Sequence, residues 1–240
     1  MTLCGGWWSG EALNVYYRGV SVLKVTATPP SGYVFFFDAN YFKLDSPLFG
    51  IPTTVAGYSG NATIGTQADC VRWLAALPQL KDAIDRWSTA KKSNPEREAQ
   101  QLLVRENNQT SAVSTATDYF VLDVEYARGD GRADVIAVHW PSTSIDRKVT
   151  VGRRLAIVEL KFGDAALAGA SGLVKHVEHT VKLAGNGPRL DLCKEMLKVY
   201  EQKRSLGLID NKRELGGLDD SGLDLVLVLA NHDPDKTVLK

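Results

Sequence analysis

The chain has 240 residues, of which 44% are hydrophobic and 23% charged, a balance that excludes a collagen-like, low-complexity or largely disordered protein. Its 28 basic and 28 acidic residues cancel, so any nucleic-acid binding has to come from a local patch rather than from net charge. The longest apolar run, Leu225–Ala230, is much too short to span a bilayer, and we expect no membrane segment.

The first residues and the cysteines both bear on location. Met1–Gly10 lacks the charged start and the apolar stretch of a secretion signal. Cys4, Cys70 and Cys193 are far apart and form no CxxC pair, which argues against a disulfide framework and against a structural zinc site. We therefore expect a reduced, cytoplasmic protein.

Residues 1–90 are predicted to be β-rich at first and then helical. Thr28-Pro-Pro-Ser-Gly32 cannot continue a strand and separates two segments rich in Val, Tyr and Phe, which predicts a β-hairpin. Pro78 interrupts a later helical pattern and predicts the start of a second helix. This part carries no motif and is expected to serve recognition, dimerisation or cover of a sheet. Its predicted elements are strands Asn14–Ala27 and Tyr33–Leu44, a loop at Gly50–Gly65, a helix from Ala68 and a helix from Pro78 to Trp87.

Residues 91–240 are predicted to form a separate α/β domain after a polar linker, Ala90–Pro95. Arg154–Phe162 leaves neither face polar, which is typical of a strand buried on both sides. The element order predicts one mixed sheet covered by helices. The predicted elements are helix Pro95–Asn107, strands Tyr119–Ala127, Ala133–Trp140 and Arg154–Phe162, helices Leu173–Ala184 and Asp191–Leu206, and strand Leu225–Ala230.

Two acids and one lysine are the main candidates for chemistry. Asp134 lies near the start of one predicted strand, and Glu159 and Lys161 lie near the end of the next. Because they are two residues apart, Glu159 and Lys161 leave their strand on one face. A carboxylate and an ammonium among apolar neighbours are costly unless they are paired or bind something. If the two strands are neighbours, Asp134 lies opposite Glu159.

Two carboxylates held together repel each other, and a divalent cation between them removes that repulsion. Hard oxygen ligands suit Mg²⁺ or Mn²⁺. The adjacent Lys161 would then stabilise a negative transition state or help to position an attacking water. This is the chemistry of metal-assisted phosphodiester cleavage, so these residues predict a metal-dependent nuclease.

Asp134 followed by Glu159-Leu-Lys161 at the end of an apolar strand resembles the PD-(D/E)xK nuclease superfamily. The resemblance covers roughly residues 95–230. It implies a restriction-endonuclease-like αβββαβ core, with a mixed central sheet flanked by helices. It also implies a Mg²⁺- or Mn²⁺-dependent endonuclease acting on DNA, in which Asp134 and Glu159 bind the metal and Lys161 is catalytic.

Members of this superfamily often carry a further acid on the helix before the sheet. Here Glu96-Arg-Glu-Ala-Gln-Gln-Leu-Leu103 resembles the corresponding segment of archaeal Holliday-junction resolvases, which implies that Glu96 is a third acidic ligand. Glu98 stays an alternative, and a first-turn acid that favours the helix dipole is an equally good account of Glu96. Glu125 is interpreted as an exposed carboxylate of the neighbouring strand.

Basic residues near the predicted site are candidates for contact with phosphates. Lys175 would begin the helix beside the site, and a basic run precedes the strand that carries Glu159. The residues predicted to bind nucleic acid are Lys148, Arg153, Arg154 and Lys175. The sequence does not separate DNA from RNA, and because many relatives are dimers the resemblance leaves a homodimer open.

Plain structural accounts compete with each of these interpretations. Glu159 and Lys161 would also suit a solvated salt bridge, and Asp134 would suit a position beside a turn. His176 and His179 are interpreted as surface residues or phosphate contacts, because no third ligand stands at a zinc-site spacing. The alternative function is a nuclease fold that binds nucleic acid or protein without catalysis.

Overall fold

A computed structural model divides the chain into two compact units, Met1–Glu98 and Ala99–Lys240, which are described separately. The predicted boundary was placed at residue 90, and α3 (Pro95–Asn107) continues from the first unit into the second. The structure describes residues 2–4, 12–30, 32–42, 58–90, 94–108, 117–167, 172–209, 214–233 and 235.

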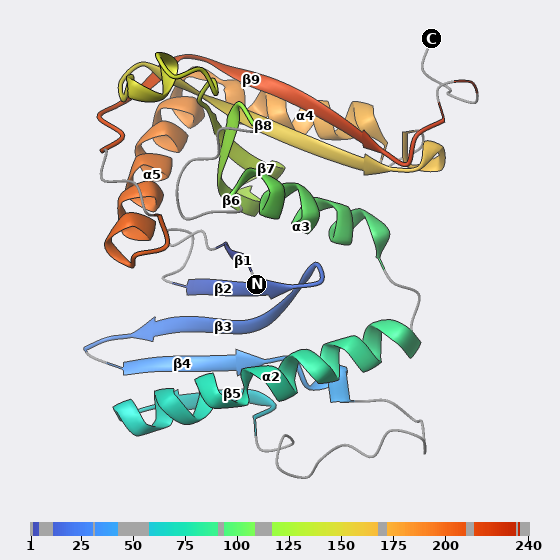
Figure 1. Cartoon of the computed structure of the whole chain (residues 1–240), viewed down its shortest axis with the longest axis vertical. Helices are drawn as coiled ribbons and strands as arrows, with labels where there is room; N and C mark the ends of the chain where they lie inside the picture. The colour runs from blue at the N-terminus through green and yellow to red at the C-terminus, as the bar shows by residue number, and fades with distance from the viewer. Residues whose placement is uncertain are drawn as a thin grey trace. The chain divides into compact units, whose positions relative to one another are not determined.

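The first unit holds a five-stranded antiparallel sheet in the order β1-β2-β3-β4-β5, with helix α2 packed against it (Figure 1). The predicted hairpin is present as β3 and β4, but Asn14–Ala27 is two strands rather than one. The chain turns at Arg18 and Gly19, whose φ angles of 50° and 76° end the extended backbone there. The elements are β1 (Thr2–Cys4), β2 (Ala12–Tyr17), β3 (Val20–Thr28), β4 (Gly32–Phe37), 3₁₀ helix η1 (Ala39–Phe42), β5 (Gly60–Ile64) and α2 (Gln67–Ala90).

Two further predictions for the first unit were wrong. Pro78 lies inside the continuous helix α2, because the apolar face of that helix, with Leu80 and Ile84 fully buried against the sheet, offsets the hydrogen bond that proline cannot donate. Within Gly50–Gly65, the part from residue 60 to residue 64 is strand β5, since it pairs with β4. Residues 50–57 lie outside the described residues.

The second unit is an α/β arrangement built on a four-stranded sheet in the order β6-β7-β8-β9. β7 is antiparallel to both β6 and β8, and β9 is parallel to β8, so the sheet is mixed as predicted. Between β8 and β9 the chain forms α4 and α5, as a parallel connection requires. The elements after α3 are β6 (Tyr119–Arg128), β7 (Gly131–His139), η2 (Asp146–Lys148), β8 (Arg153–Phe162), η3 (Asp164–Leu167), α4 (Leu173–Ala184), α5 (Asn186–Ser205) and β9 (Leu218–Ala230).

The strand that carries Glu159 is buried on both faces, as its sequence indicates. Leu155 and Ile157 point to one face and Ala156 and Val158 to the other, and none of the four is more than 4% exposed. The first pair belongs to a core shared with α4 and α5, which includes Leu183 and Tyr200 among its members. A rigid strand of this kind fixes the side chains at its carboxyl end.

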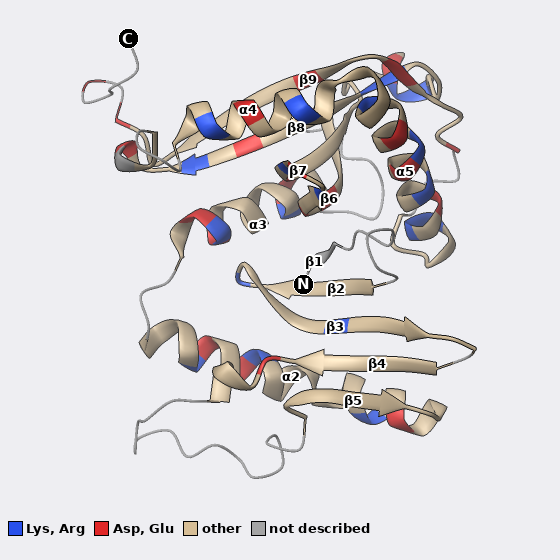
Figure 2. Ribbon diagram, turned by 180° about the vertical axis from the view of Figure 1, so that it is seen from behind, with Lys and Arg blue, Asp and Glu red and all other residues tan. Residues whose placement is uncertain are grey.

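The edge strand and the last helix are longer than predicted. β9 begins at Leu218 and α5 begins at Asn186. Asp219 and Asp224 lower the apolar signal of β9, yet both pair with β8, opposite Arg154 and Ala156, with a register shift between the two pairs. Charged residues of both signs are interspersed over α4 and α5 (Figure 2).

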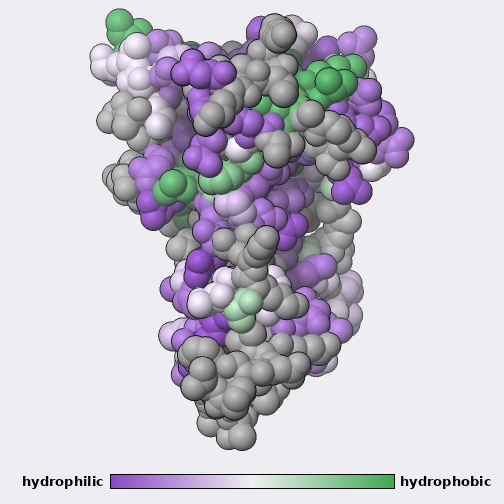
Figure 3. All heavy atoms as spheres, turned by 90° about the vertical axis from the view of Figure 1, so that its right-hand side faces the viewer, coloured by the Kyte–Doolittle hydropathy of each residue, from purple (hydrophilic) through white to green (hydrophobic). Residues whose placement is uncertain are grey.

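Hydrophilic residues dominate the face drawn in Figure 3, with hydrophobic residues in small separate groups. Among the described residues, no helix combines the length and the apolar character that crossing a membrane requires.

Candidate metal centre

The strand register places Asp134 and Glu159 side by side. β7 and β8 are antiparallel neighbours, and Val135 is paired with Val158. If this register is extended by one position, Asp134 lies opposite Glu159, and antiparallel partners have close Cβ atoms. The hydrogen bond from the Leu160 amide to Asp134 Oδ2 agrees with this placement. The convergence that the sequence predicted between two residues remote in the chain is therefore present in the structure.

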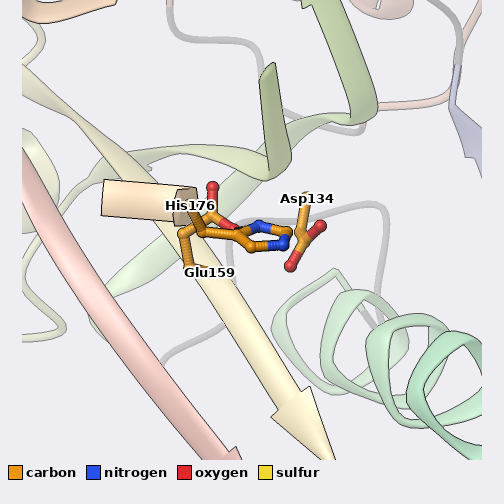
Figure 4. A group of neighbouring side chains, drawn as sticks. All are labelled: Asp134, Glu159 and His176. Carbon is orange, nitrogen blue, oxygen red and sulfur yellow. Dashed lines mark hydrogen bonds and ion pairs between the residues drawn. The ribbon is translucent and has the colours of Figure 1, made fainter. Parts of the chain in front are cut away.

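Asp134, Glu159 and His176 form a compact cluster, drawn in Figure 4. One ligand atom from each side chain lies within 4.8 Å of the other two. Asp134 Oδ2 accepts a hydrogen bond from the Leu160 amide at 2.9 Å, and Glu159 Oε2 lies 2.7 Å from His176 Nδ1. Backbone and helix thus hold both carboxylates in place.

The Glu159 carboxyl group carries an electrostatic cost in this position. The residue is only 1% exposed, and its Oε1 atom has no hydrogen-bond partner among the described residues. Burial, followed by repulsion from Asp134, raises the pKa of Glu159 to about 8, although the positive charge of Lys161 opposes this shift. A group that disfavours its own ionised form suits a site where a cation compensates the charge.

Lys161 is buried beside the two acids. It is 3% exposed and follows Glu159 by two positions on β8, so both side chains leave the same face of the strand. The attraction that it exerts on Glu159 shows that the ammonium is electrostatically part of the cluster. The simple account of Glu159 and Lys161 as a solvated strand end does not fit their burial.

His176 was interpreted as a surface residue or a phosphate contact, and the structure corrects its surface placement. Its side chain is 25% exposed and contacts the fully buried side chain of Glu159. The connection after β8 starts α4 at Leu173, which brings the first turn of the helix to the carboxyl end of the strand. The signal in the sequence was the position of His176 shortly after Glu159, but no spacing rule assigns such a residue to a ligand set. His179, three residues later, has its ring centroid 6.3 Å from that of His176.

A cavity of about 620 Å³ opens beside the cluster, and both Asp134 and His176 line it. Residues of α4 and of the β6–β7 hairpin complete the wall. Glu125 is among them and is exposed, as expected, at a φ of 52°. The basic lining residues are Arg132, Lys175 and Lys182, together with His179.

The helix before the sheet contributes a backbone contact within the second unit. Gln100 Nε2 donates to the carbonyl oxygen of Asp134 at 2.7 Å, and Gln100 is buried. Glu98 is paired instead with Arg18 at 3.0 Å, within the first unit. Glu96 lies in the first turn of α3, and its role as a metal ligand stays a prediction.

The predicted nucleic-acid contacts separate into two places. Lys175 lines the cavity next to the acids. Lys148, on η2, is exposed, and Arg153 and Arg154 begin β8, at the end opposite to Glu159. Arg153 donates to the carbonyl oxygens of Val149 and Asp146, so its guanidinium holds the preceding loop.

The donor set fits a divalent cation. Two carboxylates and one imidazole nitrogen surround a small space, and one buried carboxylate oxygen has no donor among the described residues. Oxygen ligands of this kind suit Mg²⁺ and Mn²⁺. Comparison with protein-family models, with curated proteins and with solved structures finds no match to this chain.

Proposed function

We propose that this protein is a metal-dependent nuclease that hydrolyses phosphodiester bonds of DNA through a PD-(D/E)xK-type site. The observation that carries the proposal is the juxtaposition of Asp134 with the buried Glu159 across neighbouring strands, with Lys161 on the same strand face. The order α3-β6-β7-β8-α4-α5-β9 supports it, because it accommodates an αβββαβ core of the restriction-endonuclease type.

The protein groups have distinct tasks in this proposal. Asp134 and Glu159 would hold the cation, which when bound supplies an acidified water and a positive charge near the scissile phosphate. Gln100 holds the backbone of Asp134, and the Leu160 amide holds its carboxylate. Lys161 places a fixed positive charge beside the reacting phosphate, where it stabilises the developing negative charge.

The basic residues that line the cavity beside Asp134 support the proposal that the substrate is a polyanion. Lys175 and Lys182 of α4 and Arg132 of the β6–β7 hairpin all line this cavity. Lys175 forms an ion pair with Glu178 at 3.4 Å, and Lys182 forms one with Asp130 at 3.8 Å. Both pairs are exposed. Exposed pairs of this kind contribute little and exchange readily for phosphate.

The test is cleavage of plasmid, linear and branched DNA with Mg²⁺ or Mn²⁺ by the wild type, Asp134→Ala and Lys161→Ala. We expect cleavage by the wild type only, with all three proteins folded by circular dichroism. The proposal is lost if folded wild type and variants cleave equally, or if none cleaves any nucleic acid. Saturable Mn²⁺ binding without cleavage would favour a non-catalytic binding module instead.

A further inference from the structure

The contact between His176 and Glu159 is the feature of the cluster that the PD-(D/E)xK resemblance does not explain. The imidazole Nδ1 lies 2.7 Å from Glu159 Oε2, and the ring belongs to the group that also includes Asp134 (Figure 4). In Figure 4 the ring extends toward both carboxylates.

We propose that His176 is the third protein ligand of the metal, and that the site therefore selects a transition-metal ion such as Mn²⁺ over Mg²⁺. This inference rests on the proposed metal site and adds to it the identity of one ligand and the class of ion.

The spacing of the atoms fits shared coordination. Neighbouring ligands that each lie about 2.1 Å from one ion are about 3 Å apart. The separation of 2.7 Å between His176 Nδ1 and Glu159 Oε2 is close to this value, and Asp134 completes a group in which all ligand atoms lie within 4.8 Å. The second oxygen of Glu159, buried and without a donor among the described residues, adds a further position for an ion.

An imidazole ligand changes which ion is favoured. Mg²⁺ prefers an octahedron of oxygen ligands and retains several waters, whereas imidazole suits the first-row transition metals. In a set of two carboxylates and one histidine, the histidine nitrogen therefore strengthens the binding of Mn²⁺ but contributes little to the binding of Mg²⁺. The preference comes from the nitrogen, so it disappears when the nitrogen is replaced by an amide.

A positioning role for His176 is the competing account. In that role the ring donates to Glu159 and holds the carboxylate without touching the ion. His176→Asn separates the two roles, because the asparagine amide occupies the Nδ1 position and retains a donor for Glu159 while the imidazole is lost. His179→Asn is the matched control, since His179 lies on the same helix outside the cluster.

The experiment uses the full chain with Mn²⁺ alone and needs no activity. Electron spin echo envelope modulation of bound Mn²⁺ detects a coordinated imidazole nitrogen, and ¹⁵N-labelling of histidine identifies its source. Calorimetric titration with Mn²⁺ and with Mg²⁺ gives the selectivity. We expect a histidine nitrogen signal in the wild type and in His179→Asn, and its loss in His176→Asn. The last variant should bind Mn²⁺ more weakly and lose the preference for Mn²⁺ over Mg²⁺, because the change for Mg²⁺ is smaller.

The outcomes separate this inference from the proposed function. Mn²⁺ bound by the wild type without a histidine nitrogen signal overturns the ligand role, whether or not His176→Asn folds. A signal that persists in His176→Asn does the same. If the wild type binds no Mn²⁺, or Asp134→Asn binds it as tightly, the metal site itself is wrong.

Discussion

The two ends of β8 carry charged residues in opposite circumstances. At the amino end, Arg154 donates twice to Asp219 of β9, at 2.8 and 3.2 Å, and both side chains are partly exposed. At the carboxyl end, about 17 Å away along an extended strand, Glu159 and Lys161 are almost fully buried.

This difference teaches where a charged group retains the capacity to bind a ligand. The Arg154 guanidinium is engaged by a partner on the neighbouring strand, and because both side chains are partly exposed, water also screens this pair. The Glu159 carboxyl group is kept beside another acid at a cost in stability, which a proton relieves and which a bound cation would also relieve. A candidate ligand-binding site therefore differs from a structural ion pair in that its charges are buried and do not balance. The number of charged residues does not distinguish the two.

The largest expected effect comes from the buried lysine at the carboxyl end. Lys161→Met should reduce DNA cleavage by about 100-fold or more, because in the proposed mechanism Lys161 supplies a fixed charge that stabilises the transition state. Lys203→Met is the matched control, since Lys203 is also buried but donates to the carbonyl oxygen of Leu122. Both variants should lose stability, and only Lys161→Met should lose activity at saturating DNA. Equal losses of cleavage in the two folded variants would contradict the catalytic role.

The second prediction concerns the cost of Glu159 in the metal-free protein. Glu159→Gln should be more stable than the wild type in the presence of a chelator, because a neutral amide removes the cost of keeping an ionisable carboxyl group buried next to Asp134. The pKa of Glu159 is raised from 4.5 to about 8, so the folded state holds a proton that the unfolded state releases. The wild-type free energy of unfolding should therefore fall relative to the variant as pH rises from about 4.5 to about 8, by up to about 1.4 kcal/mol per pH unit.

Urea denaturation across this pH range measures that difference. Addition of Mn²⁺ should raise the free energy of unfolding of the wild type and leave that of Glu159→Gln unchanged. A difference between the two proteins that does not vary with pH would show that Glu159 is not strained in the folded state.

The sequence predicted most of the second unit because its elements carry strong local signals. α3 and α4 match their predicted bounds, since the first begins at a proline and the second has a clear apolar stripe. The pairing of β7 with β8 could also be anticipated from the hairpin and the buried strand. The first unit holds three errors with different causes. At Pro78 and at Gly60–Ile64, burial against the sheet and pairing with β4 outweigh a local preference. At Arg18 and Gly19 the backbone turns locally, with positive φ angles that the Val- and Tyr-rich pattern does not reveal.

The candidate site was predicted in its acids and its lysine, but not in its histidine. Asp134 and Glu159 are on strands, where a two-residue period and a register decide which side chains meet. His176 is on a helix that follows residues outside the described part of the chain, and the rotation of that helix over the sheet is set by packing. The paired state of Arg154 was equally hidden, because its partner belongs to the part of β9 that the apolar pattern did not show.

A third prediction tests which basic residues contact the substrate. Lys175→Ala and Lys182→Ala should each weaken DNA binding and reduce the slope of log K against log salt by about one, since each removes one phosphate contact. Arg154→Ala should change the slope little, because its guanidinium is already paired. Fluorescence anisotropy at several salt concentrations, with Ca²⁺ in place of Mg²⁺, measures the slopes. If Arg154→Ala reduced the slope more than the lysine variants do, the prediction that Arg154 contacts phosphate would stand, and the amino end of β8 would be the end that binds the substrate.

The smallest expected effect is at the amino end of β8. A hydrogen bond from Ser221, followed by the Arg154 guanidinium, holds the pKa of Asp219 well below its usual 3.8. A lowered pKa adds stability above the unfolded value, and this contribution is lost as pH falls below about 4. The advantage of the wild type over Asp219→Asn should accordingly be constant near neutral pH and shrink in acid, the opposite direction to Glu159. Asp220→Asn, an exposed neighbour, should show no such change, and acid titrations of thermal stability compare the three. If Asp219→Asn instead behaved like Asp220→Asn, the pairing with Arg154 would contribute nothing to folding, and the two ends of the strand would differ in burial alone.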